Sequence, residues 1–280
     1  MASITFTYIR DMLKERSGLV VTPDKTYLID TRLMPVARRH GYKTIDEMVQ
    51  ALDVRHDEDL VVELCEAMNT HESLFFRDQT PFDLFQNTIL PQLLNRRAAK
   101  RRIRVWCAAC STGQEPYSLA MVLCAEAAKL KGWQVEIVAT DISHSVLERA
   151  REGVFSQFEI QRGLPVQLLV KHFSQEGEYW RLNQDIRDMV TFKPFNLLQD
   201  PSRLGSFDMV FCRNVLIYFD VATKSQVLHS ISTVLAEDGV LFLGSAESTM
   251  GLTEDFWPVE AGRGVYKHTG SPPSIAEMAS

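Results

Sequence analysis

From residue 103 onward, short apolar segments alternate with longer helical ones, and this alternation defines the class of fold. The expected strands are RIRVWCAA, WQVEIVATD, MVTFKPFN, FDMVFCRN and VLFLGS, and the expected helices include PYSLAMVLCAEAAKL, SHSVLERAREG and VATKSQVLHSISTVLAEDG. Strands separated by helices pair in parallel, and the helices cover both faces of the sheet. We therefore expect residues 98–270 to form an α/β domain around a parallel sheet.

Residues 154–190 interrupt this alternation. The segment GEYWRLNQDIRDMVTF alternates apolar and polar residues on either side of Asn183, Gln184 and Asp185. Such a pattern is typical of two antiparallel strands joined by a turn. It predicts a small antiparallel β-subdomain inserted into the α/β domain.

Residues 1–97 carry helical signals. The segment TPDKTYLIDTRLMPVARRHG starts with a threonine and a proline at helix-start positions, TIDEM has the pattern of a capping box, and TPFDLFQNTILPQLL repeats threonine followed by proline. We expect a small all-α domain here, with RRAAKRRIR as a solvated connection to the next domain. Residues 271–280 are expected to form a disordered tail.

Charge and cysteine content argue against several classes of protein. A net charge of −6 does not suit a nucleic-acid binder, because phosphate contacts favour a basic domain. No apolar run approaches the roughly 18 residues that span a bilayer, and the N-terminus lacks a signal peptide, so we expect a cytoplasmic protein without membrane insertion. Cys107 and Cys110 form a C-x-x-C without a second pair, so no metal is expected. We also expect a monomer.

The loops after the strands are where a ligand is expected, because open α/β sheets bind ligands beyond the carboxyl ends of their strands. The first loop, CAACSTGQEP, lacks the glycine patterns that bind pyrophosphate, but it offers Glu115 to an ammonium group. The next strand ends at Asp141, which suits the hydroxyls of a ribose. S-adenosyl-L-methionine has both groups and no phosphate. Since an aspartate at a strand end is as often a helix cap, both interpretations of Asp141 stay open.

Polar residues also follow the later strands. Asn196 lies just past one strand end, where its amide suits the edge of an adenine ring, although asparagine there is more often a turn former. FDMVFCRNVLIYFD leads directly into Arg213 and Asn214 and then to Tyr218. The alternative for Tyr218 is a core residue whose hydroxyl binds a backbone carbonyl.

Six blocks of the sequence, in order and at these spacings, resemble the CheR family of chemotaxis receptor methyltransferases. They are HESLFFRD, WCAACSTGQEPYSLAM, ATDIS, FNLL, FCRNVLIYFD and GVLFLGSAES, and the resemblance extends to about residue 268. It implies a protein-glutamate O-methyltransferase that uses S-adenosyl-L-methionine to esterify glutamate side chains on chemoreceptor cytoplasmic helices and releases S-adenosyl-L-homocysteine. It also implies a helical N-terminal domain, a Rossmann-like catalytic domain, and an inserted subdomain that docks on the receptor or its C-terminal peptide.

The resemblance implies roles for individual residues. Two residues are expected to face the methyl-transfer site: Arg77 and Tyr218. The expected cofactor contacts are His71, Ser73, Arg77, Glu115, Asp141, Asn196, Leu197, Arg213 and Asn214.

The chain departs from the family pattern at two places. Where the family usually has N-E-T before the aromatic pair, this chain has His71, Glu72 and Ser73, so the contact commonly made by asparagine is left to an imidazole or is absent. Gln114 replaces a frequent glutamate, and Glu115 is therefore expected to bind the methionine ammonium group.

Arg77 is interpreted as the residue that orients the acceptor. A glutamate side chain has a pKa near 4.3, so it is ionised at neutral pH and needs no general base. Arg77 is expected to hold one carboxylate oxygen, with the Tyr218 hydroxyl as a second donor, while the other oxygen attacks the methyl group. The alternative is an exposed helix-flanking arginine paired with Asp78.

A basic stretch in the helical domain is a candidate for receptor recognition. Arg32, Arg38, Arg39 and Lys43 lie close together in an otherwise acidic protein, and a basic face suits glutamate-rich helices. The alternative is an ordinary solvated face.

Two other functions also stay open: a methyltransferase acting on RNA or a small molecule, and a non-catalytic module that senses S-adenosyl-L-methionine.

Overall fold

The computed structural model describes residues 4–259 and 262–270, and the chain forms two compact units. The first contains residues 4–70 together with 218–223, and the second contains residues 71–217 and the described residues from 224 onward. None of the helices in the described residues has the length and apolar character of a membrane span. The tail expected at residues 271–280 lies outside the described part of the chain.

The first unit is helical, as expected. Its elements are α1 (Ile4–Ser17), the 3-10 helix η1 (Pro23–Lys25), α2 (Thr26–Arg39), α3 (Ile45–Arg55) and α4 (Glu58–Met68). The N-cap residues of the last two helices satisfy a free backbone donor: Thr44 accepts from the N–H of Glu47, and Asp57 accepts from that of Leu60. The helices enclose a separate apolar core that includes Ile9, Leu33 and Leu64.

The second unit is built on a seven-stranded sheet in the order β6-β2-β1-β7-β8-β10-β9. The five strands from β6 to β8 are parallel, and β10 is antiparallel to both of its neighbours. The strands are β1 (Arg102–Ala108), β2 (Gln134–Asp141), β6 (Val190–Pro194), β7 (Phe207–Cys212), β8 (Leu235–Leu243), β9 (Phe256–Pro258) and β10 (Val265–His268). The parallel strands confirm the α/β domain expected from the alternation of strands and helices, and their order confirms the Rossmann-like domain that the family resemblance implies.

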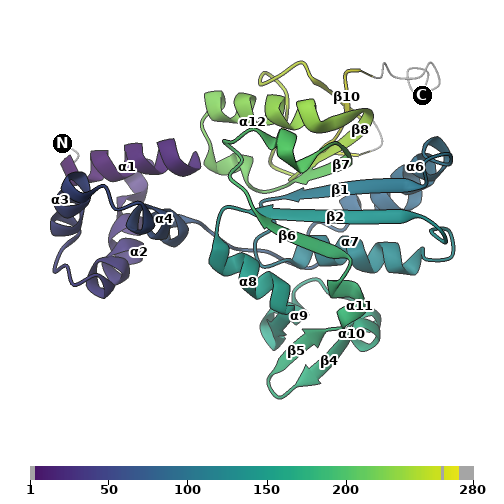
Figure 1. Ribbon diagram of the computed structural model, residues 1–280, viewed down its shortest axis with the longest axis horizontal. Helices are drawn as coiled ribbons and strands as arrows, with labels where there is room; N and C mark the ends of the chain where they lie inside the picture. The colour runs from purple at the N-terminus through teal and green to yellow at the C-terminus, as the bar shows by residue number, and fades with distance from the viewer. Residues whose placement is uncertain (1–3, 260–261, 271–280) are drawn as a thin grey trace. The chain divides into compact units, whose positions relative to one another are not determined.

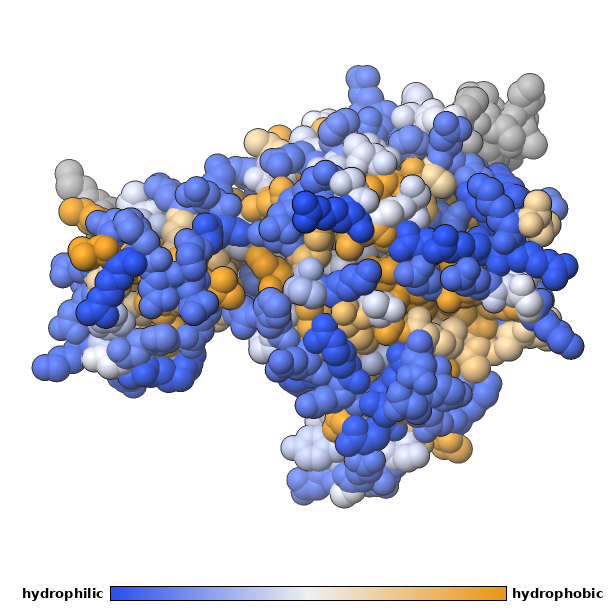
Figure 2. Space-filling model, viewed as in Figure 1, coloured by the Kyte–Doolittle hydropathy of each residue, from blue (hydrophilic) through white to orange (hydrophobic). Residues whose placement is uncertain are grey.

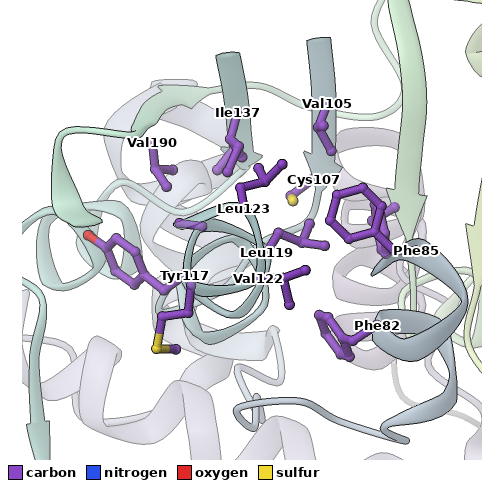
Figure 3. Close-up of a cluster of buried hydrophobic side chains, with 14 of the residues drawn as sticks. Phe82, Phe85, Val105, Cys107, Tyr117, Leu119, Val122, Leu123, Ile137 and Val190 are labelled. Atoms are coloured by element: carbon purple, nitrogen blue, oxygen red, sulfur yellow. The ribbon is translucent and has the colours of Figure 1, made fainter. Parts of the chain in front are cut away.

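Helices cover both faces of this sheet (Figure 1). Helices α7 (Gln114–Ala125) and α8 (His144–Glu152) lie on one face, and α12 (Val221–Val234) lies on the other. Figure 3 shows Leu119 and Leu123 of α7 directed toward Val105 and Ile137 of the sheet. Helix α7 is apolar on nearly all sides because it is buried between the sheet and the helices before β1.

The structure corrects the domain boundary expected at residue 97, placing it between Thr70 and His71. Residues 71–97 belong to the α/β unit because Phe82, Phe85 and Leu93 are buried in the core that contains β1 and α7 (Figure 3). The elements concerned are α5 (Thr80–Leu84), the π-helical turn η2 (Phe85–Ile89) and α6 (Leu90–Arg96).

The insertion contains a three-stranded antiparallel sheet in the order β3-β5-β4. The turn expected at Asn183–Asp185 is wrong: the hairpin turns at Gly177 and Glu178, where Gly177 has φ +62°, and Asn183 instead precedes a helical turn. Figure 2 shows mostly hydrophilic residues on the visible face of this insertion. Its elements are β3 (Val154–Ser156), α9 (Gln157–Gln161), α10 (Val166–His172), β4 (Phe173–Glu176), β5 (Tyr179–Leu182) and α11 (Gln184–Arg187).

Candidate functional site

The order of the strands places a ligand site at the carboxyl ends of β1 and β7. From β1 the chain continues to β2 and β6 on one side of the sheet, and it then returns to β7 and β8 on the other. The loops after β1 and β7 therefore separate at this point, which leaves a crevice in sheets of this type. Most of the residues predicted from the sequence to bind a ligand follow β1, β2, β6 or β7.

Asp141 ends β2 and joins two of these loops. Its side chain is buried, with Oδ2 accepting a hydrogen bond from the Ser111 N–H at 2.9 Å and Oδ1 accepting one from the Ser143 N–H at 3.0 Å. Burial raises the pKa of the Asp141 carboxyl, and these hydrogen bonds and the charge of His71 oppose the rise. Ser143 is the N-cap residue of α8, so the helix-cap interpretation of Asp141 is wrong.

The loop after β1 is a tight turn that only particular residues accommodate. Ala109, Ser111 and Gly113 have φ values of +56°, +51° and +94°. A Cβ atom on Gly113 would lie 3.1 Å from the side chains of both Ala150 and Tyr117, so glycine permits the close approach of α7 and α8. The loop thereby delivers Glu115 to the first turn of α7.

Arg213 connects Glu115 to the turn that carries Arg77. The Arg213 side chain is 2% exposed; Nη1 donates to Glu115 Oε2 at 2.9 Å, and Nη2 donates to Asp78 Oδ2 at 2.8 Å and to the Arg77 carbonyl at 2.9 Å. Burial raises the pKa of Glu115, and Arg213 opposes this rise. Within the described residues, the buried Nε of Arg213 has no hydrogen-bond partner. The predicted ligand residue Arg213 is thus mainly engaged with the protein itself.

The turn Phe75–Gln79 has a strained backbone. Phe76, Asp78 and Gln79 have φ values of +50°, +66° and +33°, which are uncommon for residues other than glycine. The turn is fixed by the burial of Phe75 and Phe76 and by a 3.0 Å hydrogen bond from the Phe76 N–H to Ser118 Oγ. Such fixation suits a residue that must be held in one orientation.

Arg77 is half-buried at the apex of this turn. Its Nη1 lies 3.5 Å from the carbonyl of Glu72, and its positive charge is one of the smaller effects that oppose the burial-driven rise in the pKa of Glu115. Asp78 is bound by Arg213, so the expected alternative of an Arg77–Asp78 pair is wrong.

The segment that precedes the turn lies beside the loop after β1. Ser111 Oγ donates to the His71 carbonyl at 3.0 Å, and the Ser111 N–H donates to Asp141, so His71 lies close to Asp141. Ser73 follows two residues later and is half-buried. His71 is thus held by its main chain, so the hydrogen bond does not require a particular side chain at this position.

Asn196 and Leu197 follow β6, next to the end of β2. The Phe195 N–H donates to the Asp141 carbonyl at 2.9 Å, and Asn196 Oδ1 accepts from the Leu198 N–H at 3.0 Å. Asn196 is therefore a turn former, as its alternative interpretation held.

Tyr218 groups with the helical unit. It ends the 3-10 helix η4 (Leu216–Tyr218), and its carbonyl accepts a 2.9 Å hydrogen bond from the Val20 N–H. The other predicted site residues all belong to the α/β unit. A role for Tyr218 opposite Arg77 stays a prediction.

Two carboxylates next to the predicted residues, Asp78 and Glu247, were not predicted from the sequence as part of the site. Asp78 binds Arg213, and the buried Glu247 accepts from the Asn214 N–H at 2.8 Å. Both pairings join segments far apart in the chain, so no local pattern indicates them. Glu247 lies in the block GVLFLGSAES, which is one of the six blocks that carry the family resemblance, so this block could have indicated it.

Cysteine and metal chemistry find no support at this site. Burial raises the pKa of the Cys107, Cys110 and Cys212 thiols well above the usual range, which disfavours reactive thiolates. In the described residues, no group of three or more His, Cys, Asp and Glu side chains is arranged to hold a metal ion.

Comparisons with known proteins match both units. Residues 4–68 match the family described as "CheR methyltransferase, all-alpha domain", and residues 71–265 match "CheR methyltransferase, SAM binding domain". The chain is 36% identical over 268 residues to "Chemotaxis protein methyltransferase Cher2" of Pseudomonas putida and 37% identical over 271 residues to "Chemotaxis protein methyltransferase 1" of Pseudomonas aeruginosa. Each alignment covers 94% of this chain and 97% of the relative. "Chemotaxis protein methyltransferase 1" of Vibrio cholerae is 37% identical over 256 residues, covering 90% of this chain and 92% of that protein.

Proposed function

This chain belongs to the CheR family and is an S-adenosyl-L-methionine-dependent methyltransferase of chemotaxis, and we propose that it methylates specific glutamate side chains on chemoreceptor cytoplasmic helices. The observation that best supports this acceptor is the contact of Arg213 with both Glu115 and the Arg77 carbonyl. One guanidinium thereby links a carboxylate suited to the cofactor with an arginine suited to an acceptor carboxylate. The proposed site of action is the cytoplasm.

The residues of the site fit the cofactor. Both oxygens of Asp141 accept backbone N–H groups, from Ser111 and Ser143, and a carboxylate offers about four lone-pair sites, so acceptor capacity remains for a ribose hydroxyl. Glu115 uses Oε2 for Arg213, and within the described residues its Oε1 accepts no hydrogen bond, which suits an ammonium donor. We propose that Asn196, Leu197 and Asn214 surround the adenosine, with His71 and Ser73 contributing from the segment before the Phe75–Gln79 turn.

Arg77 is proposed to orient the acceptor carboxylate. S-adenosyl-L-methionine supplies a methyl group on a positively charged sulfur, and the electron pair of the broken carbon–sulfur bond remains on that sulfur. The glutamate needs no base, because it is ionised near neutral pH. Arg77 binds one of its oxygens and leaves the other to form the ester bond, aligned at about 3–3.5 Å from the methyl carbon. Tyr218 is proposed as a second donor to the acceptor.

The insertion and α2 are proposed to bind the receptor. Strands β3 and β4 are edge strands in the small sheet, and an extended receptor peptide suits such an edge. On α2, Arg32 donates to the Met68 carbonyl and Arg39 pairs with Glu63, so part of the expected basic face is engaged within the helical unit. Arg38 and Lys43 are the remaining candidates for attracting an acidic helix.

The test uses S-adenosyl-L-methionine with a labelled methyl group and a chemoreceptor cytoplasmic fragment. Release of the incorporated label as methanol in mild alkali is expected, because a carboxyl ester is alkali-labile. Label that resists alkali would indicate a nitrogen acceptor and contradict the proposal. Cofactor binding without any incorporation would favour a sensing module, and incorporation into RNA or a small molecule in place of the receptor would favour the remaining alternative.

A further inference from the structure

A buried carboxylate joins the ends of the neighbouring strands β7 and β8. Glu247 is 8% exposed, and its Oε2 accepts hydrogen bonds from the backbone N–H of Asn214 at 2.8 Å and of Gly244 at 2.7 Å. Its Oε1 accepts a third from the Ile217 N–H at 3.3 Å. Glu247 therefore replaces the strand partners that the backbone loses where the two strands end.

Asn214 depends on this support for its backbone conformation. Its φ is +61°, in the left-handed region that asparagine tolerates better than most residues but still at a cost. A conformation of this kind persists only when surrounding groups fix it. The Glu247 carboxylate binds the N–H of this very residue, so it fixes the direction in which the Asn214 side chain leaves the loop.

Gly244 holds the Asn214 side chain from the other side. A Cβ atom on Gly244 would lie 2.6 Å from Asn214 Nδ2 and 2.8 Å from Glu247 Oε2. The Asn214 amide therefore packs directly against the glycine backbone. Asn214 is thus contacted at its backbone N–H by Glu247 and at its side-chain amide by Gly244.

From these contacts we propose that Glu247 is a positioning residue for cofactor binding, acting through Asn214. This inference rests on the proposed function, which assigns the Asn214 side chain to the cofactor. Glu247 itself binds backbone N–H groups and has no assigned contact with the cofactor or the acceptor.

The test measures binding of S-adenosyl-L-methionine to the full-length chain by calorimetry, for Glu247→Gln, Asn214→Ala and the double variant. Glu247→Gln is expected to raise Kd about tenfold, because one acceptor of buried N–H groups is lost. The kcat at saturating cofactor is expected to change far less. In the Asn214→Ala background, Glu247→Gln is expected to raise Kd by no more than about twofold, since the two residues act as one unit.

Two further variants separate positioning from a general loss of structure. Asp208 is another buried carboxylate at the opposite end of β7, where Oδ2 accepts from the Arg104 N–H at 2.8 Å. Asp208→Asn is expected to lower the melting temperature without changing Kd. A Cβ atom in Gly244→Ala crowds both the Asn214 amide and the Glu247 carboxylate but leaves both side chains chemically intact, so this variant is expected to raise Kd even if Glu247→Gln folds poorly.

Three results would overturn the inference: a wild-type Kd in Glu247→Gln, additive effects of Glu247→Gln and Asn214→Ala, or an equal rise of Kd in Asp208→Asn. An unchanged Kd in Asn214→Ala would remove Asn214 from the cofactor site and the inference with it. Failure of the unaltered chain to bind S-adenosyl-L-methionine would instead count against the proposed function.

Discussion

Arg213 and Glu115 form a buried ion pair, with Nη1 and Oε2 2.9 Å apart. The pair joins the loop after β7 to the first turn of α7, and the same guanidinium binds the carbonyl of Arg77. The residues proposed to bind the cofactor and the acceptor thus share one support, the Arg213 guanidinium.

Replacing Arg213 is expected to reduce both stability and cofactor affinity. Arg213→Met leaves Glu115 as a buried charge without its partner, and breaking such pairs costs about 3–5 kcal/mol. The measurements are the free energy of unfolding in urea and the Kd for S-adenosyl-L-methionine. Arg104→Met is the matched control, because Arg104 binds Glu136 and two backbone carbonyls at the other end of the sheet. The control is expected to lose stability only; a similar loss of affinity in both variants would contradict the assignment.

Cofactor binding is expected to weaken as the pH falls. Burial raises the pKa of Glu115 above its ordinary value of 4.5, so protons compete with the cofactor ammonium at a higher pH than for an exposed glutamate. The ionised carboxylate binds the ammonium, and the Kd therefore increases as the pH drops through the raised pKa. Calorimetry from neutral to mildly acidic pH measures this increase.

Glu115→Gln is the control for this pH dependence. It is expected to bind weakly at neutral pH and to show a flatter profile on acidification, with the remainder due to Asp141, whose pKa is also raised. An unaltered profile in Glu115→Gln would mean that Glu115 does not bind the ammonium group.

Arg77→Ala is expected to reduce turnover much more than cofactor affinity. Loss of acceptor orientation costs about 100-fold in rate, since small misplacements of reacting groups have effects of that size. The first measurement is kcat for methylation of a receptor fragment, with the ester product quantified by the methanol that alkali releases. The second is the Kd for S-adenosyl-L-methionine. Arg162→Ala removes a half-buried arginine that pairs with the exposed Glu72, and it is expected to change kcat little. Equal losses in kcat and affinity for Arg77→Ala would make Arg77 a cofactor ligand only.

The sequence was sufficient for features that depend on local patterns. Periodicity and strand ends located Asp141 and Glu115, because each directly follows or begins an element whose pattern is clear. The hairpin turn was missed because Asn183 is equally suited to a turn and to a helix start, whereas the actual turn uses Gly177. The boundary at residue 70 was missed because the helices of residues 71–97 are amphipathic. Their pattern shows that one face is buried, but it does not show which of the two apolar cores buries that face.

Contacts between distant segments were beyond the reach of sequence patterns. Glu247 binds Asn214 across 33 residues, and Arg213 binds Asp78 across 135. Such pairings depend on the strand order, which brings the loops after β1, β7 and β8 together. From the sequence, a charged residue in one of these loops is predicted to bind a ligand. In the fold, the same residue can instead bind and fix another residue of the protein.

The close packing of the insertion on the Arg77 turn gives a last prediction. Gly163 has φ +92°, and a Cβ atom there would lie 2.1 Å from the carbonyl oxygen of Phe75. Gly163→Ala must therefore displace the backbone next to Arg77, and we expect a loss of about 3 kcal/mol in unfolding free energy together with reduced kcat. Gly177 also has a positive φ but nothing within 4 Å of a Cβ atom, so Gly177→Ala isolates the conformational strain and is expected to cost about 1 kcal/mol with kcat unchanged. Urea denaturation and the methanol-release assay on both variants measure these effects; equal losses of stability would show that the contact with Phe75 does not constrain the turn.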